Sequence, residues 1–195
     1  MIPYYLFYDG TEAPTVPECT NFLPIDLKEE DGAVYEIMFG ALTTKKQLPD
    51  AVFSNDSKAM TAEDVTVVFC AYAPNGAVVV VGWYMHANIS RTPEILPLTT
   101  DEGIPCDHPF FFCTLRENAC LLPEEERFQS MWQIPRNKSG NKNKFGFSAD
   151  SIWYATEPSA AAWKRAFAEN IEHYMTCGNN LLCDEDIPPS EDDHP

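Results

Sequence analysis

Residues 65–84 read VTVVFCAYAPNGAVVVVGWY, and this stretch decides the fold. Residues 65–72 and 77–84 are both rich in the β-branched and aromatic side chains that favour strands. Between them stands Pro74-Asn75-Gly76, and Asn-Gly is a pair that tight hairpin turns prefer. The pattern predicts a β-hairpin that is buried on at least one face.

Shorter segments around the hairpin extend this prediction. Residues 33–39 and 110–115 are expected to be strands, and residues 150–154 a short strand or the end of one. Alternating apolar side chains at positions 4, 6 and 8 are typical of an edge strand. The centre of the chain is therefore predicted to be rich in strands.

One long helix is predicted at residues 159–177. Ser159 can cap it, Gly178 suits its C-terminal end, and its apolar face is formed at helical spacing by Trp163, Phe167, Ile171 and Tyr174. A helical turn is expected at residues 61–64, which resemble a capping box, and a helix start at residues 121–128, where Pro precedes three Glu. The predicted class is α+β, a small mixed or antiparallel β-barrel with peripheral helices and a long C-terminal helix.

The length of 195 residues suits one domain. We expect a single globular domain over residues 1–178 and an acidic, flexible tail over residues 179–195. No run of eighteen apolar residues exists, so no membrane partner is expected. The start resembles no signal peptide, and seven cysteines are an odd number, so reduced thiols in a cytoplasm are expected.

The net charge of −17 is unevenly distributed. Residues 1–66 hold twelve acids and four bases, residues 67–156 nine and seven, and residues 157–195 nine and two. Residues 127–149 contain five bases and no acid, namely Arg127, Arg136, Lys138, Lys142 and Lys144. This basic stretch is either a solvated loop or a loop that contacts phosphate. The total charge therefore excludes only a general binder of the nucleic-acid backbone.

The chain lacks the common signatures of enzymes. No Gly-x-Gly-x-x-Gly, Walker or Gly-x-Ser-x-Gly motif is present, so neither an enzyme nor a cofactor is predicted. Neither the close Cys pairs nor the paired His typical of zinc sites occur, so no metal site is expected. Only His86, Cys120 and Asp150 are candidates for acid–base or nucleophilic chemistry.

Two adjacent aromatic pairs mark strand ends, Trp83-Tyr84 and Trp153-Tyr154. Such residues after a β-rich run usually pack in the core. Because successive side chains of a strand point to opposite faces, one member of each pair could instead face a pocket. Two such pairs could form an aromatic cage that stacks on a base or holds a cation.

An ordered series of short motifs across residues 18–156 carries a resemblance. The motifs are ECTNFLP at 18–24, GAVY at 32–35, the strand at 65–71, VVGWY at 80–84, ACLLPEEER at 119–127 and IWY at 152–154. With them the chain resembles a bacterial domain family that often stands ahead of HNH-type nucleases. That family is similar to PUA-like domains, the group with EVE, ASCH and YTH domains.

The resemblance implies a non-enzymatic module that reads a modified base in DNA or RNA, in a restriction or phage-defence context, with a nuclease or other defence protein as partner. The implied ligand-binding residues are Trp83, Tyr84, Asn88, Ser151, Trp153, Tyr154 and Asn21. The implied phosphate contacts are the five bases of residues 127–149 and Arg91. Where the family carries Ser-Asn-Val-Trp-Tyr, this chain has Asp150-Ser151-Ile152-Trp153-Tyr154 and lacks the Asn, whose amide could read a base edge.

Two other functions stay open. An acidic protein-interaction protein or nucleic-acid mimic on the same fold, with base binding lost, would explain a charge of −17 on 22.0 kDa. A small-molecule enzyme with an aromatic pocket would need an acid–base pair or a nucleophile beside the aromatic residues.

Overall fold

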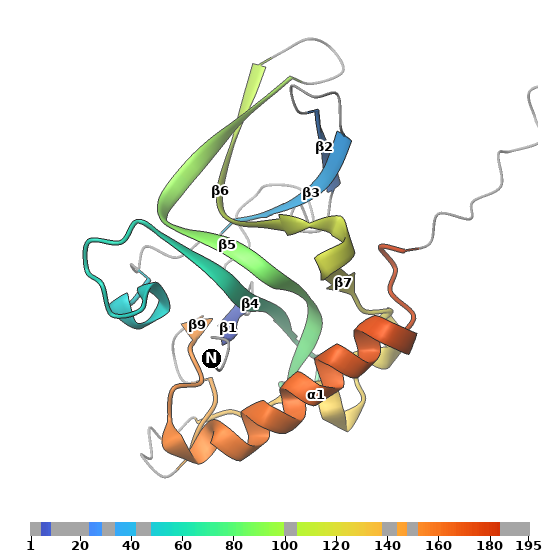
Figure 1. Ribbon diagram of the computed structural model, residues 1–195. Helices are drawn as coiled ribbons and strands as arrows, with labels where there is room; N and C mark the ends of the chain where they lie inside the picture. The colour runs from blue at the N-terminus through green and yellow to red at the C-terminus, as the bar shows by residue number, and fades with distance from the viewer. Residues whose placement is uncertain are drawn as a thin grey trace, which may run out of the picture.

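The computed structural model describes residues 5–8, 24–28, 34–41, 48–99, 105–137, 144–147 and 152–183 (Figure 1). The predicted hairpin is confirmed, since β4 (Thr61–Tyr72) pairs antiparallel with β5 (Val78–Thr99) around the Asn-Gly turn. The helical turn expected at residues 61–64 is wrong. Thr61 and Ala62 pair with Ser90 and Ile89 of β5, and this long partner strand extends β4 through the capping-box sequence.

One sheet contains all the described strands, in the order β2-β3-β6-β5-β4-β1-β9, with β7 and β8 also paired to β5. Their bounds are β1 Tyr5–Tyr8, β2 Pro24–Lys28, β3 Val34–Gly40, β6 Pro105–Leu115, β7 Ala119–Leu121, β8 Gln133–Ile134 and β9 Ile152–Trp153. The strands predicted around the hairpin are thus present as β3, β6 and β9. The expected edge strand at the N-terminus, β1, instead lies inside the sheet, parallel to β4 and antiparallel to β9.

The class is α+β, with a largely antiparallel sheet and a C-terminal helix. The expected barrel is not formed by the described strands, because β2 and β9 end the strand order and do not pair with each other. Residues 65–70 of β4 are buried without interruption, which shows that both faces of the sheet are covered. In the sequence, a strand that is covered on both faces is a continuous run of apolar residues rather than an alternation of apolar and polar residues.

Each face of the sheet carries its own hydrophobic core. Val68 and Cys70 of β4 join the first core, which the C-terminal helix covers, and Val67 and Phe69 join the second core. The second core is closed by η2 (Asp50–Phe53), a short 3-10 turn beside the hairpin (Figure 1). These two clusters are called the helix core and the loop core below.

The predicted long helix is α1 (Ala161–Cys177), preceded by the 3-10 turn η6 (Pro158–Ala160) (Figure 1). Ser159 lies inside η6 and does not cap α1, whose N-cap is Ala160 without a side-chain bond, because Pro158 starts the 3-10 turn one residue earlier. Gly178 ends α1 as predicted, and a Cβ there would lie 2.3 Å from the Tyr174 ring. The predicted apolar face packs on the helix core, with Phe167, Ile171 and Tyr174 buried and Trp163 partly buried.

The helix expected at residues 121–128 is only one 3-10 turn, η4 (Glu124–Glu126). Arg127 donates from Nε and Nη2 to the Leu122 carbonyl at 2.9 and 2.7 Å. These bonds link the residues on either side of the 3-10 turn. Of the flexible tail expected over residues 179–195, only residues 179–183 lie among the described residues. Leu182 is buried, and the Asn180 amide bonds the backbone of β7, so residues 179–183 pack on the domain.

The ends of β5 and β6 form a two-stranded arm, seen at the top of Figure 1. The β4 pairing stops at Ser90 and the β3 pairing at Phe112, so residues 94–99 and 105–110 pair only with each other among the described strands. Three pairs contain proline: Ile95–Pro109, Pro97–Asp107 and Thr99–Pro105. The three pairs follow one another at every second residue, so their backbone groups all point the same way relative to the partner strand. Because proline has no N–H to donate, these are the pairs whose backbone groups point outward. Proline therefore removes donors from both open edges of the arm.

Candidate functional site

The first predicted aromatic pair is divided between the two cores. Trp83 lies in the helix core and Tyr84 in the loop core, and both side chains have no exposed surface. Consecutive side chains of a strand point to opposite faces, and here both faces are covered. Burial also raises the pKa of the Tyr84 phenol. Neither ring therefore lines an open pocket in the part of the chain that the structure describes.

The second pair is divided in the same way. Trp153 belongs to the helix core, and Tyr154 is partly buried against the loop core. Trp153 donates from Nε1 to both carboxylate oxygens of Glu157 at 2.9 Å. Its ring centroid lies 6.1 Å from that of Phe145 and 5.4 Å from that of Trp163. Trp83 and Trp153 thus share a core, but they pack against different rings.

Trp83 instead packs on Trp132 of the 3-10 turn η5 (Ser130–Trp132), with 5.2 Å between ring centroids. Both rings also meet Tyr174 of α1, edge to face. The Nε1 atoms of Trp83 and Trp132 are buried and have no hydrogen-bond partner among the described residues. Buried donors are nearly always paired, and each unpaired one costs about 1–3 kcal/mol. Two such donors therefore lie on one pair of packed rings.

Of the remaining predicted ligand contacts, one lies among the described residues. Asn88 is exposed on β5, where its backbone pairs with Cys113 of β6. Asn21 and Ser151 lie outside the described residues. Among the described residues, the exposed Asn88 therefore forms no open site with Trp83 and Tyr84, which have no exposed surface.

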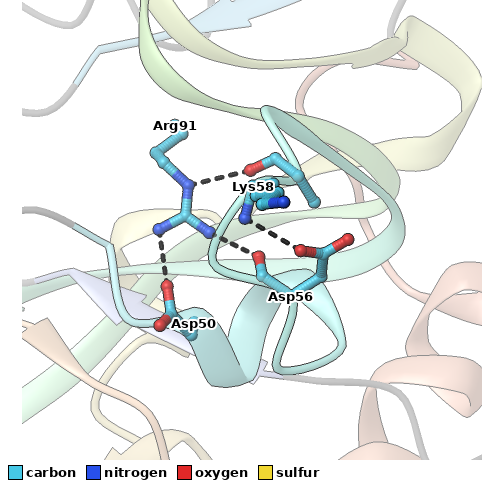
Figure 2. Close-up of polar contacts among 5 residues, drawn as sticks. Asp50, Asp56, Lys58 and Arg91 are labelled. Carbon is cyan, nitrogen blue, oxygen red and sulfur yellow. Dashed lines mark hydrogen bonds and ion pairs between the residues drawn. The ribbon is translucent and has the colours of Figure 1, made fainter.

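Arg91, expected to contact phosphate, binds its own chain (Figure 2). Its Nε donates to the Ala59 carbonyl at 2.8 Å, Nη1 to Asp50 Oδ1 at 2.8 Å and Nη2 to the Asp56 carbonyl at 3.0 Å. The guanidinium carbon also lies 4.0 Å from the centroid of the Phe53 ring. Its side chain is only 15% exposed. These contacts fasten residues 50–59 to β5.

Two other bases that were predicted to contact phosphate, in residues 127–149, also form hydrogen bonds within the protein. Arg127 binds the Leu122 carbonyl, and Arg136 donates to the Gly76 carbonyl and to the Tyr72 hydroxyl, over whose ring it lies at 4.7 Å. Lys144 is exposed. Lys138 and Lys142 lie outside the described residues. The two described arginines of this stretch therefore hold the fold together rather than face solvent freely.

The two described candidates for chemistry, one buried and one exposed, do not form a common site. Cys120 is buried, and burial raises the pKa of its thiol, which opposes formation of a nucleophilic thiolate. His86 Nδ1 lies 2.6 Å from Asp64 Oδ1 on the exposed side of the hairpin, and both residues have a positive φ, 51° and 58°. They mark bulges where the β4–β5 register shifts. Asp150 lies outside the described residues, and the described residues contain no cluster of His, Cys, Asp and Glu suited to a metal ion.

A groove of about 420 Å³ lies elsewhere, at the start of β3. It is lined by Tyr35 and Glu36 of β3, Leu115 of β6, Arg116 and Glu117 of the 3-10 turn η3 (Arg116–Asn118), and Leu182 and Cys183 near the C-terminus. Arg116 shapes it, because its Nη1 binds Glu36 Oε1 at 2.6 Å while Nε and Nη2 bind the Leu182 carbonyl at 2.9 and 2.6 Å. The groove thus combines apolar side chains with two carboxylates and one paired cation.

Sequence reasoning did not find this groove. Its residues come from three segments that are distant in sequence, and only Tyr35, the last residue of GAVY at 32–35, stands in one of the motifs. The one local signal is Tyr35, an aromatic residue at the start of a predicted strand that stays 40% exposed.

Comparisons with models of protein families, with curated proteins and with solved structures found no match for this chain. Across the described ranges, no helix has the length and apolar character needed to cross a membrane.

Proposed function

We propose that this protein is a non-enzymatic interaction module that binds a basic partner through its acidic surface, as a mimic of nucleic acid would. The use of the arginines carries this proposal. Arg91, Arg116, Arg127 and Arg136 each donate to carbonyl, carboxylate or hydroxyl oxygens of their own chain. Each of these arginines commits at least two of its five N–H donors in this way, and a committed donor can hold phosphate only if its bond within the fold breaks.

The distribution of charge supports the same function. The chain carries 30 acids against 13 bases, and exposed acids occur on β4, η3, η4 and α1. A surface with such an excess repels nucleic acid and attracts cationic proteins, and the attraction weakens as salt screens it. A basic partner is therefore the chemically matched one.

Isothermal titration calorimetry at low and at moderate salt tests this function. We expect poly-L-lysine to bind at low salt and to lose affinity as salt increases, and we expect single- and double-stranded oligonucleotides not to bind. Duplex DNA, which is also polyanionic, should compete with the protein for poly-L-lysine. Failure of poly-L-lysine to bind at low salt would refute the proposal.

A modified-base reader is a second candidate, supported by one observation. The unpaired Nε1 donors of Trp83 and Trp132 lie at the aromatic pair where the sequence predicts a pocket. Base carbonyls could accept these hydrogen bonds if the rings separated, and stacking contributes about 1–3 kcal/mol per base. Titration of tryptophan fluorescence with modified and unmodified oligonucleotides tests it. An unchanged spectrum at low salt would exclude this reader.

A further inference from the structure

We infer that the groove at the start of β3 is the docking site for an extended basic segment of the partner, with an apolar side chain next to a Lys or Arg. This inference rests on the proposed function and assigns it a place and a ligand chemistry. The groove volume of about 420 Å³ lies in the range of ligand sites and fits a few side chains of a peptide.

The apolar part of the groove is formed by Tyr35, Leu115 and Leu182. Leu115 pairs with Ile37 of β3, and Tyr35 precedes Ile37 by two residues, so Tyr35 and Leu115 lie on one face of the sheet. They are among the large apolar side chains that stay exposed, at 40% and 36%. An aliphatic side chain of a partner would cover this surface and gain the corresponding transfer free energy.

The charged part of the groove selects a cation. Glu36 is paired with Arg116, whereas Glu117 is exposed and forms no ion pair with a residue that the structure describes. Two carboxylates against one cation leave the lining with a net negative charge. The exposed Tyr35 ring offers a face for a cation as well. A Lys or Arg of the partner thus finds both a carboxylate and an aromatic ring.

Chain connectivity strengthens the same preference. Cys183 lines the groove, and the next ten residues contain the acids Asp184, Glu185, Asp186, Glu191, Asp192 and Asp193. Because these acids share the sign of Glu36 and Glu117, the tail itself is a poor occupant. A second copy of a chain with charge −17 and a nucleic acid are disfavoured on the same ground. A cationic segment is the occupant that this arrangement attracts.

The groove contains its own reporter, the exposed thiol of Cys183. Cys177 is exposed on α1 and is absent from the groove lining, so it serves as an internal control. The probe is the peptide Lys-Leu-Arg-Leu-Lys, compared with its Glu-Leu-Glu-Leu-Glu counterpart and with penta-lysine. We expect the first peptide to slow alkylation of Cys183 by iodoacetamide at least about threefold at saturation and to leave Cys177 unchanged, as read by mass spectrometry.

Affinities of groove variants give the second arm of the experiment. Glu117→Gln should weaken peptide binding about two- to fivefold and Leu115→Ala about tenfold. The matched controls Glu169→Gln on α1 and Ile95→Ala on the arm, both at exposed positions, should bind like the parent protein. Circular dichroism of each variant verifies that the fold is intact.

The outcomes separate this inference from the proposed function. Equal affinities of the groove variants and the parent, or equal protection of Cys183 and Cys177, would overturn the groove even where poly-L-lysine binds. Binding of penta-lysine as tight as that of the Leu-containing peptide would also overturn it, because the apolar half would then contribute nothing. Failure of poly-L-lysine to bind refutes the proposed function itself.

Discussion

Replacing Arg91 with alanine should detach residues 50–59 from the hairpin. These residues include η2, which closes the loop core through Val52 and Phe53. Arg91 is their cross-link to β5, with three hydrogen bonds and a ring contact (Figure 2). If Arg91 acts as a structural anchor, its loss should appear in the free energy of unfolding.

The magnitude follows from the individual contacts of Arg91. Hydrogen bonds from a charged donor to the carbonyls of Ala59 and Asp56 contribute about 1.5–3 kcal/mol each. The pair with Asp50, whose side chain is 51% exposed, contributes less than about 1 kcal/mol because solvent screens it. The contact with Phe53 adds about 0.5–1 kcal/mol. Water can reach the freed carbonyls of this exposed loop, so we expect a net loss of about 3 kcal/mol.

Urea denaturation at neutral pH measures this loss, and a thermal melt should shift by about 6–12 °C. Arg91→Lys keeps the charge and loses the planar fork, so it should recover less than half of the lost stability. Arg165→Ala, at an exposed position of α1, is the matched control and should change stability by less than about 0.5 kcal/mol. Trypsin should also cleave faster after the exposed Lys58 in Arg91→Ala.

An Arg91→Ala protein as stable as its parent would refute the anchor. If that stable variant had also lost binding to oligonucleotides, the phosphate contact predicted from the sequence would be the better interpretation.

Three further predictions concern a close contact, buried titrating groups and the arm. Gly178→Ala should destabilise the protein by about 1–3 kcal/mol in urea, because a Cβ would lie 2.3 Å from the Tyr174 ring; no loss would show that the end of α1 shifts freely. Burial raises the pKa of the Cys120 thiol and the Tyr84 phenol above their unfolded values, so stability is full below pH about 8.5 and falls as the pH rises further. Urea unfolding from pH 7.5 to 10.5 under reducing conditions measures this, and a flat profile would contradict it. Tyr84→Phe should make the decline above pH about 10 less steep, while the Tyr174 phenol, whose pKa is also raised, still contributes. Pro97→Val restores an outward N–H on the arm, so sedimentation velocity should detect concentration-dependent self-association that the parent lacks, and a monomer at all concentrations would contradict the role of this proline.

The parts of the fold that were predictable are those with local causes. The hairpin follows from the Asn-Gly turn between two β-rich runs, and α1 from the helical spacing of Trp163, Phe167, Ile171 and Tyr174 up to Gly178. The place of β1 was not predictable, because its parallel pairing of Tyr5 with Thr66 joins residues that are distant in sequence. Local propensity also failed at residue 61, where pairing with Ser90 outweighs the capping-box pattern.

The site was harder to predict for the same reason. Alternation correctly separates the side chains of Trp83 and Tyr84, but it cannot tell that both faces of the strand are covered. The hydrogen-bond partners of an arginine side chain are equally hard to predict from the sequence. Those of Arg91 and Arg127 are mostly backbone carbonyls, which every residue supplies. The family resemblance stays a prediction.

The arginines connect the fold to the proposed function. The chain has five arginines, and four of them join segments of the fold; Arg165 alone is exposed on α1 and forms none of these contacts. An arginine can bind several carbonyls at once, which suits a domain in which loops and 3-10 turns must be fastened to one sheet. The same use commits at least two N–H donors of each of these four arginines to the fold, while exposed acids stay at the surface. The acidic character that would attract a basic partner comes from 30 acids against 13 bases, and the arginines used to hold the loops do little to offset it at the surface.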